Sequence, residues 1–136
     1  YVSFTLKDDM SNRLRSGEDL SMVVEQLADE PVAGVMVNCS YPEAITAAMP
    51  ILSTSGLAFG GYGNGFTSVD ALKPGLTVDE LTARKDLLPD RYAEHVYRWI
   101  KTGAKIVGGC CEISPEHIAV LAKGLNDKGH RITSFS

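Results

Sequence analysis

The chain has 136 residues, of which 44% are hydrophobic, enough for the core of one ordinary domain but not for two large ones. Its 13 basic and 17 acidic residues give a net charge of −4 at pH 7. That balance argues against nucleic acid or an anionic membrane as a partner, since either would favour clustered lysine and arginine. No apolar run approaches the roughly 20 residues of a membrane-spanning helix. Three cysteines, an odd number, fit a reduced cytoplasmic protein better than a disulfide-bonded secreted one.

The first part of the chain predicts two units, each a strand followed by a helix. Residues 2–6 form a β-like apolar run, and residues 17–30 have the spacing of an amphipathic helix that ends at Pro31. Residues 32–38 are almost continuously apolar, which is typical of a strand buried on both faces. A second helix is expected to begin near Pro42, because proline is favoured in the first turn. The apolar faces of these helices are Leu20, Val23, Val24 and Leu27, and then Ile45, Ala48, Met49 and Leu52.

The second part of the chain predicts two more units of the same kind. Residues 57–61 form a weaker strand, and residues 92–100 form an amphipathic helix. Residues 104–108 form a short strand, after which Ser114 as N-cap and Pro115 at the first helical position begin a last helix. The apolar faces of these helices are Tyr92, Val96, Trp99 and Ile100, and then Ile118, Leu121, Ala122 and Leu125.

A long connection, from residue 61 to about residue 89, joins the third strand to the third helix. Connections beyond about 12–15 residues are usually lids, binding loops or disordered segments. Residues 78–88 are expected to form a helical turn or two. The glycine-rich stretch 60–65 lacks the Lys-Ser/Thr of a phosphate-binding loop, and no helix follows it directly. An unusual backbone at a strand end is the better interpretation of these glycines.

Four consecutive strand–helix units with buried strands indicate an α/β fold with a parallel sheet. A complete (β/α)8 barrel needs eight strands and typically about 250 residues. Four units therefore correspond to half of a barrel, with edge strands that stay exposed unless something covers them. We expect residues 1–136 to form a single partial barrel domain, completed by missing chain or by a second copy.

The three cysteines are the strongest candidates for chemistry. Cys39 follows Asn38 at the C-terminal end of one predicted strand, and Cys110 and Cys111 lie at the C-terminal end of another. In parallel α/β folds, ligands and catalytic groups gather at that edge of the sheet. Zinc bound by thiolates is typically tetrahedral, so three thiolates leave one position open. We therefore predict a catalytic zinc site that holds a substrate thiol as its thiolate.

The adjacent cysteines constrain the backbone. Neighbouring residues of a strand point to opposite faces, so both sulfurs reach one ion only if the chain turns. Gly108 and Gly109 would permit such a turn. Two alternatives stay open: Cys39 as a buried structural cysteine, and a disulfide within the adjacent pair with a redox role.

The histidines are weaker candidates. His95 lies within the third helix, His117 lies in the first turn of the last helix, and His130 sits in a polar tail. None shares the strand-end rim, so we expect surface or helix-end positions rather than metal coordination. Asn64, in the glycine-rich stretch, is expected to offer a hydrogen bond into the site.

Two strand ends carry a resemblance to a known family. The pair Asn38-Cys39, followed later by Ile106-Val107-Gly108-Gly109-Cys110-Cys111, resembles the zinc-binding pattern of the homocysteine S-methyltransferases. The segments 92–104 and 114–118 are similar to the family's segments on either side of the cysteine pair. The resemblance covers nearly the whole chain and corresponds to the C-terminal half of the family's (β/α)8 barrel.

The resemblance implies a function. Cys39, Cys110 and Cys111 would bind Zn²⁺, and homocysteine sulfur would take the fourth position. This sulfur would attack the methyl group of S-methylmethionine, S-adenosylmethionine or betaine, and Asn38 and Asn64 would contact the substrates. The alternatives are a non-catalytic zinc-binding half-barrel or oligomerisation fragment, and a redox module.

Overall fold

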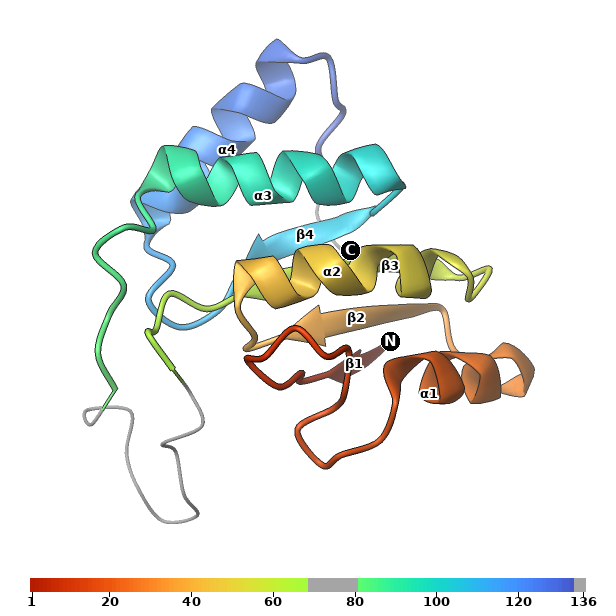
Figure 1. The fold of residues 1–136 in the computed structure, drawn as a ribbon. Helices are drawn as coiled ribbons and strands as arrows, with labels where there is room; N and C mark the ends of the chain where they lie inside the picture. The colour runs from red at the N-terminus through yellow and green to blue at the C-terminus, as the bar shows by residue number, and fades with distance from the viewer. Residues whose placement is uncertain (69–80, 134–136) are drawn as a thin grey trace.

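The computed structural model describes residues 1–68 and 81–133 and shows strands alternating with helices (Figure 1). In chain order the elements are β1 (Val2–Phe4), α1 (Leu20–Gln26), the 3₁₀ helix η1 (Leu27–Asp29), β2 (Gly34–Asn38), α2 (Pro42–Ser53), β3 (Ala58–Gly63), α3 (Pro89–Thr102), β4 (Ile106–Gly109) and α4 (Pro115–Asp127). The predicted α/β fold of four strand–helix units is confirmed.

All four strands run parallel and pair in the order β1-β2-β3-β4. Right-handed connections between successive parallel strands place the helices on one face of the sheet. Figure 1 shows α2 in front of the sheet, with α1 and α3 on either side of it, and α3 also packs against α4. The opposite face carries no helix in the described part of the chain.

The core lies between the sheet and the helices. Val35 and Val37 of β2 are fully buried, as are Ile45 and Met49 of α2. Trp99 of α3 is also fully buried, and its indole Nε1 donates a hydrogen bond to Thr46 Oγ1 of α2 at 2.8 Å. These contacts fix the helix layer against the sheet and so fix where each strand ends.

Helix ends follow local signals in the sequence. Ser114 is the N-cap of α4 and Pro115 its first residue, as predicted. Gly103 ends α3 with φ 114°, a left-handed conformation that glycine adopts without strain. The first helix is shorter than the predicted 17–30, because Asp19 caps it and it tightens into η1 before Pro31.

The long connection differs from its prediction. Residues 81–88 contain no helix, and Ala83 instead forms an antiparallel bridge with Phe66. Residues 78–80 lie outside the described part of the chain. The two stems of the connection therefore pair with each other close to the end of β3.

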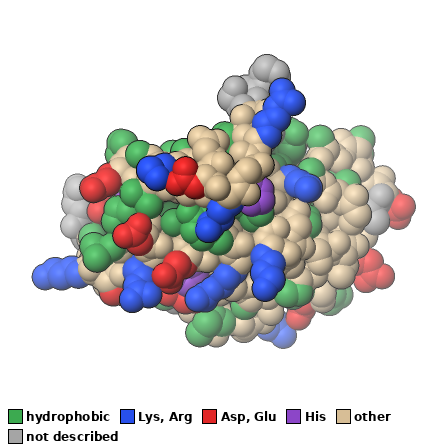
Figure 2. All heavy atoms as spheres, turned by 90° about the horizontal axis from the view of Figure 1, so that it is seen from above, with side chains coloured by type: hydrophobic (Ala, Val, Ile, Leu, Met, Phe, Trp, Pro, Cys, Tyr) green, Lys and Arg blue, Asp and Glu red, His purple; other side chains and the backbone are tan. Residues whose placement is uncertain are grey.

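The face of the molecule above α2 and α3 carries both charge types. Seen from above Figure 1, basic side chains are interspersed with acidic and apolar ones (Figure 2). Among the helices that the structure describes, none combines the length and the apolar character needed to cross a membrane.

Candidate metal centre

Three cysteine sulfurs meet at the C-terminal edge of the sheet. Cys39 directly follows β2, and Cys110 and Cys111 directly follow β4. Their Sγ atoms all lie within 4.8 Å of one another, and those of Cys110 and Cys111 are 3.9 Å apart. Cys39 and Cys110 are joined as a disulfide with Cα atoms 5.8 Å apart, whereas Cys111 is a free, exposed thiol. The joined pair is thus not the adjacent pair that the redox alternative considered.

The end of β3 supports Cys39 from one side. The Cys39 amide donates to the Tyr62 carbonyl at 3.2 Å, and the Asn64 amide donates to the Ser40 carbonyl at 3.0 Å. Ser40 is fully buried, and its hydroxyl accepts a hydrogen bond from the Leu6 amide at 2.8 Å. The turn after β2 is therefore held by backbone hydrogen bonds as well as by packing.

The same end of β3 supports the adjacent cysteines from the other side. The Cys110 amide donates to the Gly63 carbonyl at 2.9 Å, and the Gly65 amide donates to the Cys111 carbonyl at 2.9 Å. Residues 62–65 thus lie between the two cysteine-bearing segments and bond to both. The separation between the Cys39 segment and the Cys110–Cys111 segment therefore depends on residues 62–65, which contain no cysteine.

Left-handed backbone conformations occur at both cysteine-bearing turns. Cys39 has φ 45° and Glu112 has φ 62°, both uncommon for residues other than glycine. The prediction that Gly108 and Gly109 provide the turn is wrong, because both lie in β4 and neither has a positive φ. Gly109 is needed for a different reason, since an added Cβ there would overlap the Ile113 side chain. The turn that reorients Cys111 spans residues 110–113, closed by a hydrogen bond from the Ile113 amide to the Cys110 carbonyl at 3.1 Å.

Tyr92 of α3 ties the ends of β3 and β4 together beneath the cysteines. Its buried hydroxyl donates to the Gly108 carbonyl at 2.5 Å and accepts from the Gly63 amide at 3.0 Å. Burial raises the pKa of this phenol well above its usual value, so it stays a neutral donor. The sequence marked Tyr92 only as part of an apolar helix face and gave no signal for this role.

The two predicted asparagines occupy different environments. Asn38 Oδ1 accepts a hydrogen bond from Ser3 Oγ at 2.8 Å, and Ser3 Oγ also accepts one from the Tyr62 hydroxyl at 3.3 Å. Asn64 is fully buried, and its Oδ1 accepts from the Phe66 amide at 3.1 Å. Its Nδ2 has no hydrogen-bond partner within residues 1–68 and 81–133. Of the two asparagines, Asn64 is therefore the one whose side-chain donor is buried without a partner among the described residues.

The histidines lie outside the sulfur cluster, as predicted. His117 caps α4: its Nδ1 accepts from the Ser114 amide at 3.2 Å, and its Nε2 donates to the Leu87 carbonyl at 2.9 Å. His95 faces α2, with Nδ1 3.3 Å from Thr46 Oγ1 and its side chain 15% exposed, so the predicted surface or helix-end position is wrong for this residue, whereas His130 is exposed. Both nitrogens of His117 are engaged, so this residue serves the helix end.

The sulfur cluster fits a thiolate-bound metal. Zinc–sulfur bonds of about 2.3 Å at tetrahedral angles place neighbouring sulfurs about 3.8 Å apart. The 3.9 Å between the sulfurs of Cys110 and Cys111 matches this spacing, whereas the bonded sulfurs of Cys39 and Cys110 would have to separate on reduction. Thiolates select zinc and other thiophilic metals, whereas magnesium and calcium prefer oxygen ligands. In the reduced chain the three cysteines would hold such an ion and leave room for one further ligand.

The family and structural relatives agree with this fold. Residues 1–125 match the model of the family described as homocysteine S-methyltransferase. A homocysteine S-methyltransferase of Escherichia coli (strain K12) is 32% identical over 123 residues, which are 89% of this chain and 37% of that protein.

Two solved structures of a homocysteine methyltransferase from Escherichia coli are also similar. The metallated form has a TM-score of 0.63 and 31% identity, covering 90% of this chain and 34% of that one. The oxidized form has a TM-score of 0.64 and 28% identity, covering 91% of this chain and 35% of that one. These neighbours are TIM barrels, and the present chain spans about a third of their length.

Proposed function

The chain belongs to the homocysteine S-methyltransferase family, and from this premise we propose that its three cysteines bind one zinc ion and activate the thiol of homocysteine for methyl transfer. The observation that carries the proposal is the meeting of Cys39, Cys110 and Cys111 at one edge of the sheet, with their sulfurs within 4.8 Å of one another. No histidine or carboxylate among the described residues joins this cluster. The donor set is therefore all sulfur.

The chemistry starts from the reduced chain, because a disulfide sulfur is not a thiolate ligand. Zinc bound by the three cysteines would favour the thiolate form of homocysteine at neutral pH. The homocysteine sulfur, its proton released to solvent, attacks the methyl carbon of S-methylmethionine, S-adenosylmethionine or betaine. A new sulfur–methyl bond gives methionine, and the electron pair of the broken bond stays on the sulfur or nitrogen of the donor.

Two asparagines are assigned to the substrates. The buried Asn64 has a carboxamide nitrogen without a partner in the described part of the chain, so this nitrogen is the donor we assign to a bound substrate. Asn38 is oriented by the hydrogen bond from Ser3 and is the last residue of β2, directly before Cys39. A buried donor without a partner is costly, and a substrate oxygen would remove that cost.

The remaining strands of the barrel are proposed to come from the N-terminal half or from a second copy of this chain. Strands β1 and β4 are the two edges of the sheet, and the relatives are about two and a half times as long. In this proposal residues 1–136 are the C-terminal half of a cytoplasmic enzyme. Its partners are homocysteine and a methyl donor, with no nucleic acid or membrane.

The test is zinc content together with methyl transfer. The reduced chain is expected to bind one zinc ion per chain. The Cys110→Ser variant should lose both the metal and any methylation of homocysteine. Met22→Ser, which removes an exposed sulfur from α1, is the matched control and should keep both. A reduced chain that takes up no zinc would contradict the proposal.

A second candidate function is a non-catalytic zinc-binding half-barrel, favoured by the short span relative to the family. Substitution of cobalt for zinc separates the two candidates. If homocysteine changes the thiolate absorption bands of the cobalt form, a coordination position is open and the site is built for chemistry. If homocysteine leaves them unchanged and chelation unfolds the chain, the metal serves folding alone.

A further inference from the structure

Arg84 bridges the first turn of α2 and the connection that follows β3. Its guanidinium donates to both carboxylate oxygens of Glu43, each at 2.8 Å. It also donates to the Asp86 carboxylate at 2.7 and 3.2 Å, and lies 5.5 Å from the centre of the Tyr41 ring. A bidentate arginine–carboxylate pair fixes orientation as well as distance, which a single charge contact does not.

Both ends of this bridge lead directly to a cysteine-bearing segment. Glu43 is the second residue of α2, which begins at Pro42, three residues after Cys39. On the other side, the Arg84 amide donates to the Gly65 carbonyl at 2.7 Å, and the Gly65 amide donates to the Cys111 carbonyl at 2.9 Å. The contacts from Cys39 through Glu43, Arg84 and Gly65 to Cys111 therefore form one continuous path.

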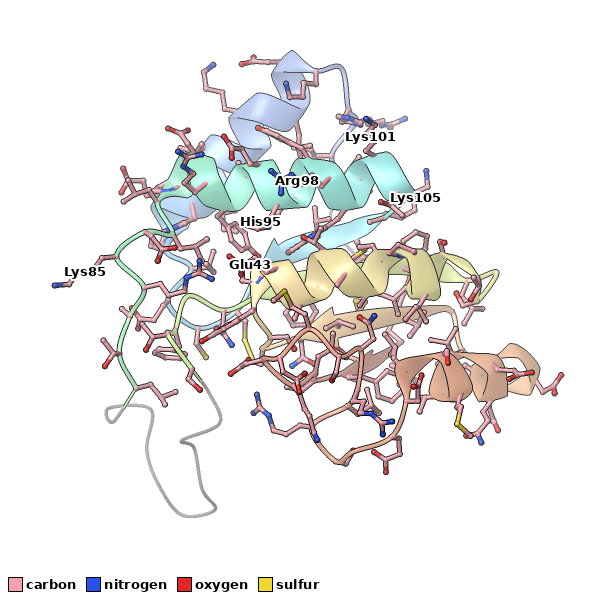
Figure 3. The ribbon with its side chains drawn as sticks, viewed as in Figure 1. Glu43, Lys85, His95, Arg98, Lys101 and Lys105 are labelled. Atoms are coloured by element: carbon pink, nitrogen blue, oxygen red, sulfur yellow. A yellow bond between two sulfur atoms is a disulfide. The ribbon has the colours of Figure 1, made fainter. Side chains whose placement is uncertain are left out.

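The pair is partly shielded from water and backed by further polar contacts. The side chain of Arg84 is 14% exposed and that of Glu43 is 34% exposed. His95 of α3 points toward Glu43 from the α3 side (Figure 3), with Nε2 3.7 Å from the carboxylate. Thr46 Oγ1 contacts His95 Nδ1 and accepts a hydrogen bond from the indole of the buried Trp99. The His95 side chain that faces Glu43 is therefore held by the core. Such shielding distinguishes this pair from the exposed Arg91–Glu94 pair, whose side chains are 67% and 51% exposed.

We propose that Arg84 is a positioning residue for the metal ligands: by clamping Glu43 while its backbone holds Gly65, it sets the spacing between Cys39 and Cys111. This inference rests on the proposed metal centre. Arg84 touches neither sulfur, so it acts only through the two segments that it joins. A salt bridge that merely anchored the connection would stabilise the fold without any effect on metal affinity.

The test compares zinc affinities of folded, reduced protein, measured by competition with a chromophoric chelator on the whole chain. Arg84→Met keeps the aliphatic length and removes the guanidinium, and is expected to weaken zinc binding about tenfold, the lower end of the effect of residues that orient ligands. Glu43→Gln should have a similar effect, and the double variant should be no weaker than either single variant. Arg84→Lys keeps the charge without the bidentate geometry and should restore only part of the affinity.

Lys85→Met is the matched control, because Lys85 is exposed and points away from the site (Figure 3). Its zinc affinity should equal that of the unmodified chain. Unchanged affinity in Arg84→Met or Arg84→Lys, even with a lower unfolding temperature, would overturn the inference and leave the metal centre intact. If Arg84→Met does not fold, Arg84→Lys and Glu43→Gln decide by the same comparison. An unmodified reduced chain that binds no zinc would overturn the metal centre and this inference with it.

Discussion

Replacing Tyr92 by phenylalanine removes one buried oxygen and leaves the ring in place. The hydroxyl satisfies two backbone groups at once, the Gly63 amide and the Gly108 carbonyl, on neighbouring strands. Phenylalanine would leave the buried amide without a partner, at a cost of about 1–3 kcal/mol. The partly buried carbonyl keeps some access to water and costs less. We therefore expect Tyr92→Phe to lower the free energy of unfolding by about 2–4 kcal/mol, a large share of the roughly 5–15 kcal/mol typical of a domain.

The assay is urea denaturation of the reduced chain, with the slope against urea compared between variants. Tyr97→Phe is the control, because the Tyr97 hydroxyl makes no hydrogen bond among the described residues and packs against Gly124. That variant should change stability by no more than about 0.5 kcal/mol. If Tyr92→Phe and Tyr97→Phe are equally mild, Tyr92 does not hold the strand ends together.

Three further predictions follow from the site and its surroundings. Zinc uptake, measured as metal per chain, should require a reductant because the Cys39–Cys110 disulfide excludes two of the three ligands. Gly109→Ala should destabilise by about 1–3 kcal/mol in urea denaturation, since its added methyl overlaps a neighbouring side chain; Gly108→Ala, which makes only an ordinary contact, should cost clearly less. Burial lowers the pKa of His95, so the unfolded chain takes up that proton first and stability should fall as pH drops below about 6.5. His95→Gln should flatten this part of the stability–pH curve, and an unchanged curve would contradict the assignment.

Much of the fold could be predicted because its signals are local. Apolar runs at strand spacing and stripes at helix spacing recur in order along the chain, and Ser114-Pro115 marks a helix start without any tertiary information. The edge at which the cysteines gather also followed from the sequence. In a parallel sheet every strand ends at the same rim, so strand ends far apart in the sequence must meet there.

The features that could not be predicted depend on contacts between distant residues. Arg84 and Glu43 are separated by 41 residues, and neither stands out by spacing or composition. The turn at the adjacent cysteines was assigned to glycines because glycine tolerates positive φ, yet Gly109 is present to admit Ile113. A glycine that permits close packing and one that permits a turn look the same in a sequence, and only the position of the neighbouring side chain separates them.

The left-handed conformation of Cys39 shows what the site requires of its surroundings. Glycine would adopt φ 45° with less strain, but it would carry no sulfur. A strained residue persists only where its neighbours determine its conformation. Here the Tyr62 carbonyl accepts a hydrogen bond from the Cys39 amide, and the Ser40 carbonyl accepts one from the Asn64 amide. The end of β3 thus stabilises on one side the left-handed turn that carries Cys39, and on the other side it holds the two cysteines that complete the cluster.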